Sequence, residues 1–334
     1  MTTCNPTRLN QSSRPSTPSL SGHQPFCWLD RRQSIAAFLT LVALAATTLA
    51  AGHGFQVAAA NADDSSAKTG EKPSNLAAPV DGQRVFYTGH SFHMFVPPQL
   101  EQLVKSAGIT NHKLAGAQGI GGSRVIQHWD LADDKNKAKP ALTSGQVDVF
   151  TMAAHLQIPD DGITNFTELG LKHNPNLRLL VQASWFPFDV ADPTKRVREN
   201  SQRDQAKVED LQAAVDDWRK KLEAQVDDLN RKHERRAVYI VPVGDAVVKL
   251  RAMIIAGKFP GIEKQSELFT DPIGHGKGQI QALATYCNFA AIYRRNPEGL
   301  TLNVAGVDAA QHAILQRLAW ETVSQYPYAG LKAK

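Results

Sequence analysis

Five short apolar segments, spaced along the chain after residue 80, limit the possible folds more than any other feature. They are Val85–Thr88, His112–Leu114, Val147–Met152, Leu177–Ala183 and Ala237–Val243. Each is about as long as a strand, and neighbouring segments are separated by enough chain for a helical crossover of about a dozen residues. Strands that alternate with helices pair in parallel, and a parallel sheet is covered by helices on both faces. The sequence therefore predicts an α/β protein with a mainly parallel sheet.

One segment within this pattern is strongly amphipathic. Between Ser201 and Arg236, apolar residues recur at steps of three and four amid dense charge, at Val208, Leu211, Val215, Trp218, Leu222, Val226 and Leu229. That spacing predicts a long helix with one apolar face. The face would serve either as a coiled-coil arm for dimerisation or as a crossover helix lying on the sheet, and we favour the crossover helix.

The first 62 residues have the organisation of a signal peptide. Arg31 and Arg32 precede an almost uncharged apolar run, Ile35–Ala51, and Ala60-Asn61-Ala62 offers a small-residue cleavage site. The paired arginines permit twin-arginine export, but their surroundings fit that signal poorly, so we expect Sec-type export. The alternative is an uncleaved anchor helix, because the run approaches the shortest span of about 17 residues. Either way, we expect the folded part to be exported, to the periplasm or the extracellular space.

The remaining chain has the composition of a folded protein. Residues 63–81 are rich in Ser, Lys and Pro and are expected to form a flexible linker, and 82–330 one domain. With 42% hydrophobic and 21% charged residues, the chain can bury a full core. Removing residues 1–62, which carry four arginines and one aspartate, lowers the net charge from +5 to +2. No nucleic-acid partner is expected from that charge.

Cysteine usage argues against thiol chemistry. Cys4 and Cys27 would leave with the signal peptide, so the mature protein would keep Cys287 alone and form no internal disulfide. Cys287 lies in the apolar stretch ATYCNFAAIY, where a buried, inert thiol is expected.

A serine follows the first predicted strand in a setting that suits a nucleophile. The stretch RVFYTGHSFHMF, Arg84–Phe95, changes from a buried strand to a turn that contains Ser91. Gly89 lets the backbone turn sharply, and ligands of parallel sheets bind beyond the carboxyl ends of the strands. Taken alone, the pattern fits a helix N-cap serine better than a nucleophile, because Gly-x-Ser is common.

Two further segments supply groups that a nucleophilic serine needs. In LFTDPIGHGKGQ, Asp271 and His275 lie in a Gly/Pro loop just before an apolar helix, where the acid can orient the imidazole as a base. In GAQGIGGSRVIQHW, Gly116–Trp129, a glycine-rich turn follows the second strand and can present backbone N–H groups to an oxyanion.

In this order and context, the three segments resemble the SGNH, or GDSL-type, hydrolase superfamily over roughly residues 83–297. The resemblance implies a flavodoxin-like, three-layer α/β/α sandwich on a five-stranded parallel sheet. It also implies that Ser91 is the nucleophile and an oxyanion donor, that His275 is the base and that Asp271 is its orienting acid. Gly122 matches the second oxyanion donor, with Gly121 as the nearest competitor.

The chain departs from the family pattern at two positions. The family acid usually lies three residues before the histidine, where this chain has Pro272, whereas Asp271 lies four before. The family also has an Asn after the third strand as a third oxyanion donor, and VDVFTMAAHLQIPDD contains none. His155 or Gln157 could replace it, and losing one donor costs about 100 to 1000-fold in rate.

The sequence thus predicts a secreted serine esterase or deacylase without a cofactor or a resident metal, acting on a small-molecule or carbohydrate ester such as an acylated sugar. No membrane contact is expected beyond the N-terminal anchor alternative, and the oligomeric state stays open. One alternative is a non-catalytic carbohydrate-binding or scaffold protein with the same fold. Another is a metal-dependent hydrolase, because His90 and His93 could bind a metal together with Asp271 or His275.

Overall fold

Five parallel strands form one sheet in the computed structural model, which describes residues 79–190 and 193–332, all within the unit Thr69–Lys334. The strands are β1 Arg84–Gly89, β2 Lys113–Gly119, β3 Val149–Ala154, β4 Arg178–Ala183 and β5 Val238–Val241. Their order in the sheet is β2-β1-β3-β4-β5, and every neighbouring pair is parallel. This is the flavodoxin-like order of doubly wound sheets, which confirms the predicted fold class.

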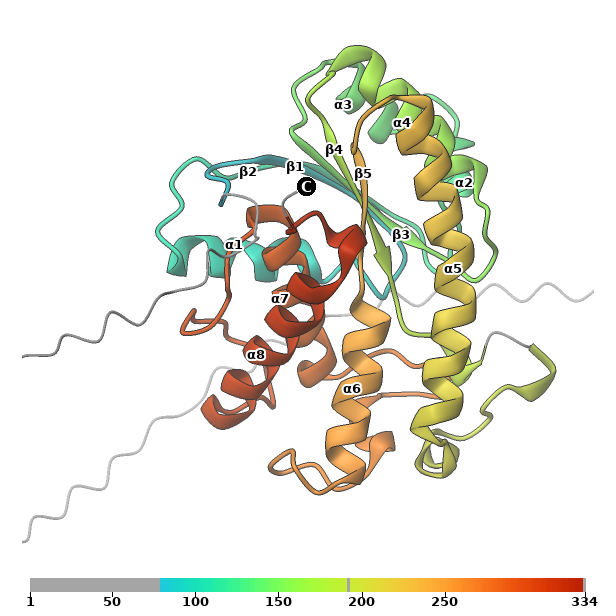
Figure 1. The fold of residues 1–334 in the computed structure, drawn as a ribbon, viewed down its shortest axis with the longest axis vertical. Helices are drawn as coiled ribbons and strands as arrows, with labels where there is room; N and C mark the ends of the chain where they lie inside the picture. The colour runs from blue at the N-terminus through green and yellow to red at the C-terminus, as the bar shows by residue number, and fades with distance from the viewer. Residues whose placement is uncertain (1–78, 191–192, 333–334) are drawn as a thin grey trace, which may run out of the picture. The chain divides into compact units, whose positions relative to one another are not determined.

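Side chains alternate between the two faces of the sheet and build two separate cores. Val85, Tyr87, Val149 and Leu180 belong to one core and Phe86 and Phe150 to the other. The first core is completed by helices α1 Val96–Ser106, α6 Val243–Ile255, α7 Gly278–Tyr293 and α8 Ala309–Gln325. The second is completed by α2 Val125–Trp129, α3 Ala138–Thr143, α4 Asp161–His173 and α5 Val208–Lys232. Figure 1 shows α1, α7 and α8 on one side of the sheet and α2, α4 and α5 on the other.

Short 3-10 turns complete the described elements: η1 Pro187–Asp189, η2 Pro193–Lys195, η3 Asn200–Gln205, η4 Gln265–Leu268 and η5 Pro327–Ala329. Three of them, η1 to η3, lie in the long connection between β4 and α5. That connection reaches the carboxyl edge of the sheet, where it contacts the candidate site described below.

The long amphipathic helix is a crossover helix, as we favoured. The predicted apolar stripe of α5 is buried against the second core from Leu211 to Leu229. The α-helix starts at Val208, later than the sequence predicted, and ends at Lys232. Residues 200–205 form η3 instead, and the side chain of Arg203 in this turn is buried in contacts with other segments.

The second strand is longer than its apolar segment suggested. β2 continues through the polar and glycine-rich sequence KLAGAQG. Gly116 has φ +148° and its missing Cβ would lie 2.6 Å from the ring of Phe86, so a side chain there would displace a core residue. Because β2 is an edge strand with exposed positions, it does not need the continuous apolar run of a central strand.

The predictions for the N-terminal segment lie outside the described residues. These are the signal peptide, the anchor alternative, the cleavage site and all of the linker except residues 79–81. No helix in the part of the chain that the structure describes is both long and apolar enough to cross a membrane.

A buried aspartate joins the loops that follow β2 and β3. The carboxylate of Asp160, which has no exposed surface, accepts hydrogen bonds from the N–H groups of Val125 at 3.0 Å, Ile126 at 2.9 Å and Gly162 at 2.9 Å. Gly162 must be glycine, because a Cβ would lie 2.2 Å from the backbone nitrogen of Ile126. The N-termini of α2 and α4 are therefore fixed to each other at the carboxyl edge of the sheet.

We predict that Asp160→Ala lowers the free energy of unfolding by about 3 kcal/mol, because it leaves buried N–H donors without acceptors. Urea denaturation followed by circular dichroism measures the change. The neighbouring Asp161→Ala is the matched control: this side chain is exposed at the start of α4, so its loss should cost less than about 1 kcal/mol. Equal losses for the two variants would contradict the role of Asp160.

Candidate active site

Ser91 lies in the turn that connects β1 to α1, at the carboxyl end of a central strand. Gly89 ends the strand with no room for a side chain, since a Cβ would meet that of Ala153 at 2.9 Å. His90 O then accepts hydrogen bonds from the N–H of His93 at 3.0 Å and of Met94 at 3.2 Å, which closes the turn. Ser91 is exposed at its tip. It is not a helix cap, because the N-cap of α1 is Phe95.

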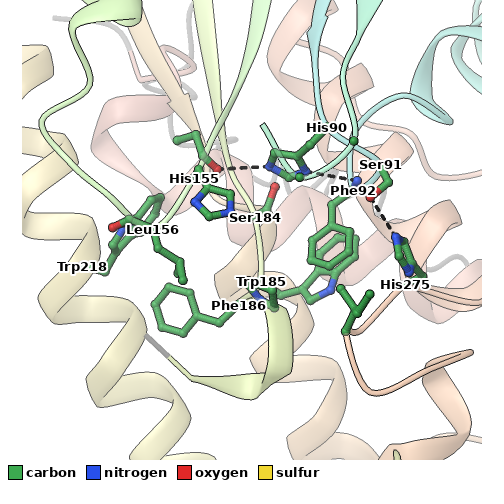
Figure 2. A pocket seen from close by; sticks show the side chains of 15 residues that line it. His90, Ser91, Phe92, His155, Leu156, Ser184, Trp185, Phe186, Trp218 and His275 are labelled. Atoms are coloured by element: carbon green, nitrogen blue, oxygen red, sulfur yellow. Dashed lines mark hydrogen bonds between the residues drawn. The ribbon is translucent and has the colours of Figure 1, made fainter. Parts of the chain in front are cut away.

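The structure brings Ser91, His275 and Asp271 into one chain of hydrogen bonds. Ser91 Oγ lies 2.9 Å from His275 Nε2, and His275 Nδ1 lies 2.6 Å from Asp271 Oδ2. Figure 2 shows the Ser91–His275 contact at the edge of a pocket. The two ring nitrogens of His275 thus face a hydroxyl and a carboxylate, the arrangement in which an imidazole can take a proton from the serine.

A tight turn lets Asp271 contact His275, although Asp271 lies four residues before the histidine and not three as in the family pattern. Its Oδ1 accepts hydrogen bonds from the N–H of Gly274 at 2.9 Å and of His275 at 3.2 Å, and Gly274 has φ +103°. Partial burial raises the pKa of Asp271, but the hydrogen bonds from the His275 side chain and from these N–H groups outweigh it, so the net pKa is lowered. Asp271 is therefore ionised at neutral pH, and its Oδ2 can accept a hydrogen bond from Nδ1 of His275.

Two residues that sequence analysis did not single out hold the acid loop in place. Trp185 Nε1 donates to Gly274 O at 2.8 Å, and Arg203 Nη2 donates to Pro272 O at 2.7 Å. Arg203 is fully buried and is paired with Asp189, which also accepts from Arg251 at 2.8 Å. The sequence offered no local signal for the contacts with Gly274 and Pro272, because these residues are 89 and 69 positions away from Trp185 and Arg203.

A pocket of about 380 Å³ opens beside Ser91. Its walls come from the loops after β1, β2, β3 and β4, from the acid loop and from α5 (Figure 2), and its lining residues are His90, Ser91, Phe92, Gly121, Gly122, Ala154, His155, Leu156, Ser184, Trp185, Phe186, Pro187, Trp218, Ile273 and His275. The pocket therefore lies beyond the carboxyl ends of the strands, where the topology of the sheet predicts a ligand.

The glycine-rich turn after β2 reaches this pocket, where Gly121 and Gly122 are lining residues. Within the described residues, the backbone N–H groups of Ser91, Gly121 and Gly122 donate to no other protein group. A buried network fixes the turn: Gln118 donates to His128 Nδ1 at 3.3 Å, His128 Nε2 lies 2.8 Å from Ser123 Oγ, and Ser123 Oγ donates to Ile120 O at 2.9 Å. The N–H groups predicted as oxyanion donors thus have no hydrogen bond to another described residue that a substrate would have to replace.

The two residues considered as a third oxyanion donor differ in position. His155 lines the pocket, lies close to His90 with 6.0 Å between ring centroids, and forms no hydrogen bond with any described residue. Gln157 is exposed and is not among the lining residues. Burial lowers the pKa of His155, so its ring is neutral at pH 7 and has one N–H to donate.

The histidines beside Ser91 direct their ring nitrogens to protein groups. His90 Nε2 lies 3.3 Å from Ala154 O and its Nδ1 accepts from the N–H of Phe92 at 3.2 Å. His93 Nδ1 contacts Gln182 Oε1 at 2.8 Å and its Nε2 contacts Thr151 Oγ1 at 2.9 Å. All four ring nitrogens thus have a contact with a protein group, and residues 79–190 and 193–332 contain no cluster of three or more potential metal ligands.

Cys287 is fully buried in α7, as predicted. Burial raises the pKa of its thiol well above the usual value, which makes a thiolate nucleophile unavailable at neutral pH.

The buried histidines make stability sensitive to acid. Burial lowers the pKa of His90 to about 3, of His93 to about 4 and of His128 to about 4. The unfolded chain, with histidine pKa values near 6.5, binds protons below that pH while the folded protein does not. We therefore predict that the free energy of unfolding falls by about 5 kcal/mol between pH 7 and pH 5.

Urea denaturation at each half pH unit measures this loss. In His128→Gln, which keeps a polar side chain beside Ser123, the loss should shrink by about one third, because one of the three histidines with large pKa shifts is gone. The exposed His173→Gln is the control and should leave the loss unchanged. A loss of the same size in both variants would show that other groups cause it.

Comparison with known proteins gives a likeness of fold. No family model and no curated protein matches the chain. A solved DUF4886 family protein from Bacteroides uniformis matches with 17% identity and a TM-score of 0.49 over 73% of this chain and 96% of that one. A protein from Slackia heliotrinireducens, named as a candidate SGNH hydrolase, matches with 12% identity and a TM-score of 0.38. The match covers 63% of this chain and 98% of that one. A protein from Parabacteroides merdae, named as a candidate GDSL-like lipase, matches with 12% identity and a TM-score of 0.39. The match covers 63% of this chain and 95% of that one.

Proposed function

We propose that this protein is a serine esterase of the SGNH type. The observation that carries the proposal is the hydrogen-bond chain from Ser91 Oγ through His275 to Asp271, placed at the mouth of a pocket. A non-catalytic binding protein of this fold has no need for a serine 2.9 Å from an imidazole that is itself oriented by a carboxylate. The predicted signal peptide would place this activity in the periplasm or outside the cell.

The proposed reaction begins when His275 Nε2 takes the proton of Ser91 as Oγ attacks the ester carbonyl. Asp271 holds the other ring proton on Nδ1 and stabilises the imidazolium. The imidazolium then gives its proton to the departing alcohol, which leaves an acyl group on Ser91. A water molecule, deprotonated by His275, attacks that acyl-enzyme and releases the acid.

The negative charge on the carbonyl oxygen would be stabilised by N–H groups that face the pocket. Ser91 and Gly122 supply backbone donors, with Gly121 as the competitor for the second position, and His155 supplies a third donor in place of the family's Asn. Because these groups have no partner among the described residues, they need no rearrangement when the charge develops.

We predict that Ser91→Ala and His275→Ala each lower kcat for ester hydrolysis by at least about 10⁴-fold without changing the fold. Asp271→Asn should cause a large but smaller loss of about 10³-fold, mainly in kcat, because it removes the charge that stabilises the imidazolium. Hydrolysis of p-nitrophenyl acetate and labelling by a fluorophosphonate probe measure the effects.

Ser144→Ala is the control for the triad, because this serine is exposed at the end of α3, outside the pocket. It should hydrolyse and label like the wild type. An unchanged rate in Ser91→Ala would remove Ser91 as the nucleophile. A folded wild type that binds glycans but hydrolyses no ester would favour the binding-protein alternative.

We also predict that His155→Ala lowers kcat by about 100 to 1000-fold with little change in KM, because an oxyanion donor acts mainly in the transition state. His155→Asn, which restores an N–H donor of the family's type, should recover most of the rate. The exposed Gln157→Ala should behave like the wild type. Loss of rate in Gln157→Ala, with none in His155→Ala, would assign the donor to Gln157.

A further inference from the structure

The pocket beside Ser91 has two chemically different ends. Figure 2 shows His275 at one end and Leu156 and Trp218 at the other, with Ser91 on the His275 side. The His275 side chain is 37% exposed, so its end of the pocket is open to solvent. The other end is closed by α5, which contributes Trp218.

The closed end is apolar. Its walls are Leu156, Phe186 and Trp218, with the rings of Phe186 and Trp218 packed edge to face at 6.0 Å. The one polar hydrogen of Trp218 is used, since Nε1 donates to Leu156 O at 2.9 Å. No Asp, Glu, Lys or Arg side chain is among the residues that line the pocket. His155 and Ser184 are the polar side chains nearest to this end, so most hydroxyl groups of a sugar would lack partners there, whereas an alkyl or aryl group needs none.

The chemistry of the triad determines which part of an ester enters each end. His275 must give its proton to the departing alcohol, so the alcohol has to lie next to His275, at the open end. The acyl group lies on the other side of the carbonyl carbon and therefore points towards Leu156 and Trp218. A carbohydrate, as the sequence resemblance led us to expect, would then be the alcohol and would remain in contact with solvent.

The volume limits the size of the acyl group. If each non-hydrogen atom takes up about as much space as a water molecule in the liquid, about 30 Å³, the whole pocket of about 380 Å³ holds about a dozen atoms, which the acyl group shares with any part of the alcohol inside the pocket. An acetyl group would leave most of the apolar wall uncovered. This inference rests on the proposed esterase function and deepens it: we propose that the substrate is an ester of a medium-length or aromatic apolar acid, with the acyl group bound against Leu156, Phe186 and Trp218.

Methyl esters of increasing acyl length test the proposal, because methanol is too small to compete for the pocket. Titration of the released acid should show that kcat/KM rises about fourfold per methylene, or about 250-fold over the four methylenes from acetyl to hexanoyl, as each methylene leaves water. Hydrolysis of methyl acetate as fast as, or faster than, methyl hexanoate would overturn the proposal while leaving the esterase function intact.

A variant that fills the closed end of the pocket provides a second test of the acyl-group proposal. Leu156→Trp places a large ring at the closed end, so the ratio of hexanoyl to acetyl kcat/KM should fall at least about tenfold. Leu114→Trp is the matched control: it makes the same change at a leucine of β2 that is 45% exposed and outside the pocket, and it should keep the wild-type ratio. An unchanged ratio in Leu156→Trp would place the acyl group elsewhere.

Binding without turnover separates the two proposals. In Ser91→Ala, methyl hexanoate should quench the fluorescence of the pocket residues Trp185 and Trp218 at concentrations at least about 30-fold lower than methyl acetate does. If the wild type hydrolyses no ester but this preference holds, the esterase proposal fails and the apolar site stands. If the two esters bind equally to Ser91→Ala, the apolar acyl site is wrong, whatever the wild type hydrolyses.

Discussion

The parallel direction of the five strands is the constraint on which the whole site depends. Because all carboxyl ends lie at one edge, the loops after β1, β2, β3 and β4 converge there and supply Ser91, Gly122, His155 and Ser184 to one pocket. The acid loop before α7 approaches the same edge and brings His275 to Ser91. A change in the direction or order of one central strand would remove a wall of the pocket.

Buried neutral polar side chains form hydrogen bonds that stabilise the turn containing Ser91. His93 lies under the Ser91 turn and contacts Gln182 of β4 at 2.8 Å, which in turn accepts from Asn288 of α7 at 2.9 Å. This network joins the turn that contains Ser91 to β4 and α7. Burial keeps His93 neutral, so the network avoids a charge in the core, at the cost of sensitivity to acid.

The acid loop shows how distant contacts make an unusual spacing workable. An Asp four residues before the histidine reaches Nδ1 only because the turn at Gly274 brings the backbone back on itself. Trp185 and Arg203 hold the carbonyl groups of Gly274 and Pro272 in that turn. The buried charge of Arg203 is compensated by Asp189, so the connection between β4 and α5 serves as the support of the triad.

By itself, the sequence predicted five strands, although β2 is longer than expected, together with the long amphipathic helix and the three segments that carry Ser91, Gly122 and His275. These features depend on local patterns of apolar residues and glycine, which act over a few residues. Only the tertiary structure decided that Asp271 reaches His275, that His155 rather than Gln157 faces the pocket, and that the Trp218 side chain closes its far end. Each of these depends on how segments far apart in the chain pack at one edge of the sheet, and no local pattern encodes such a contact.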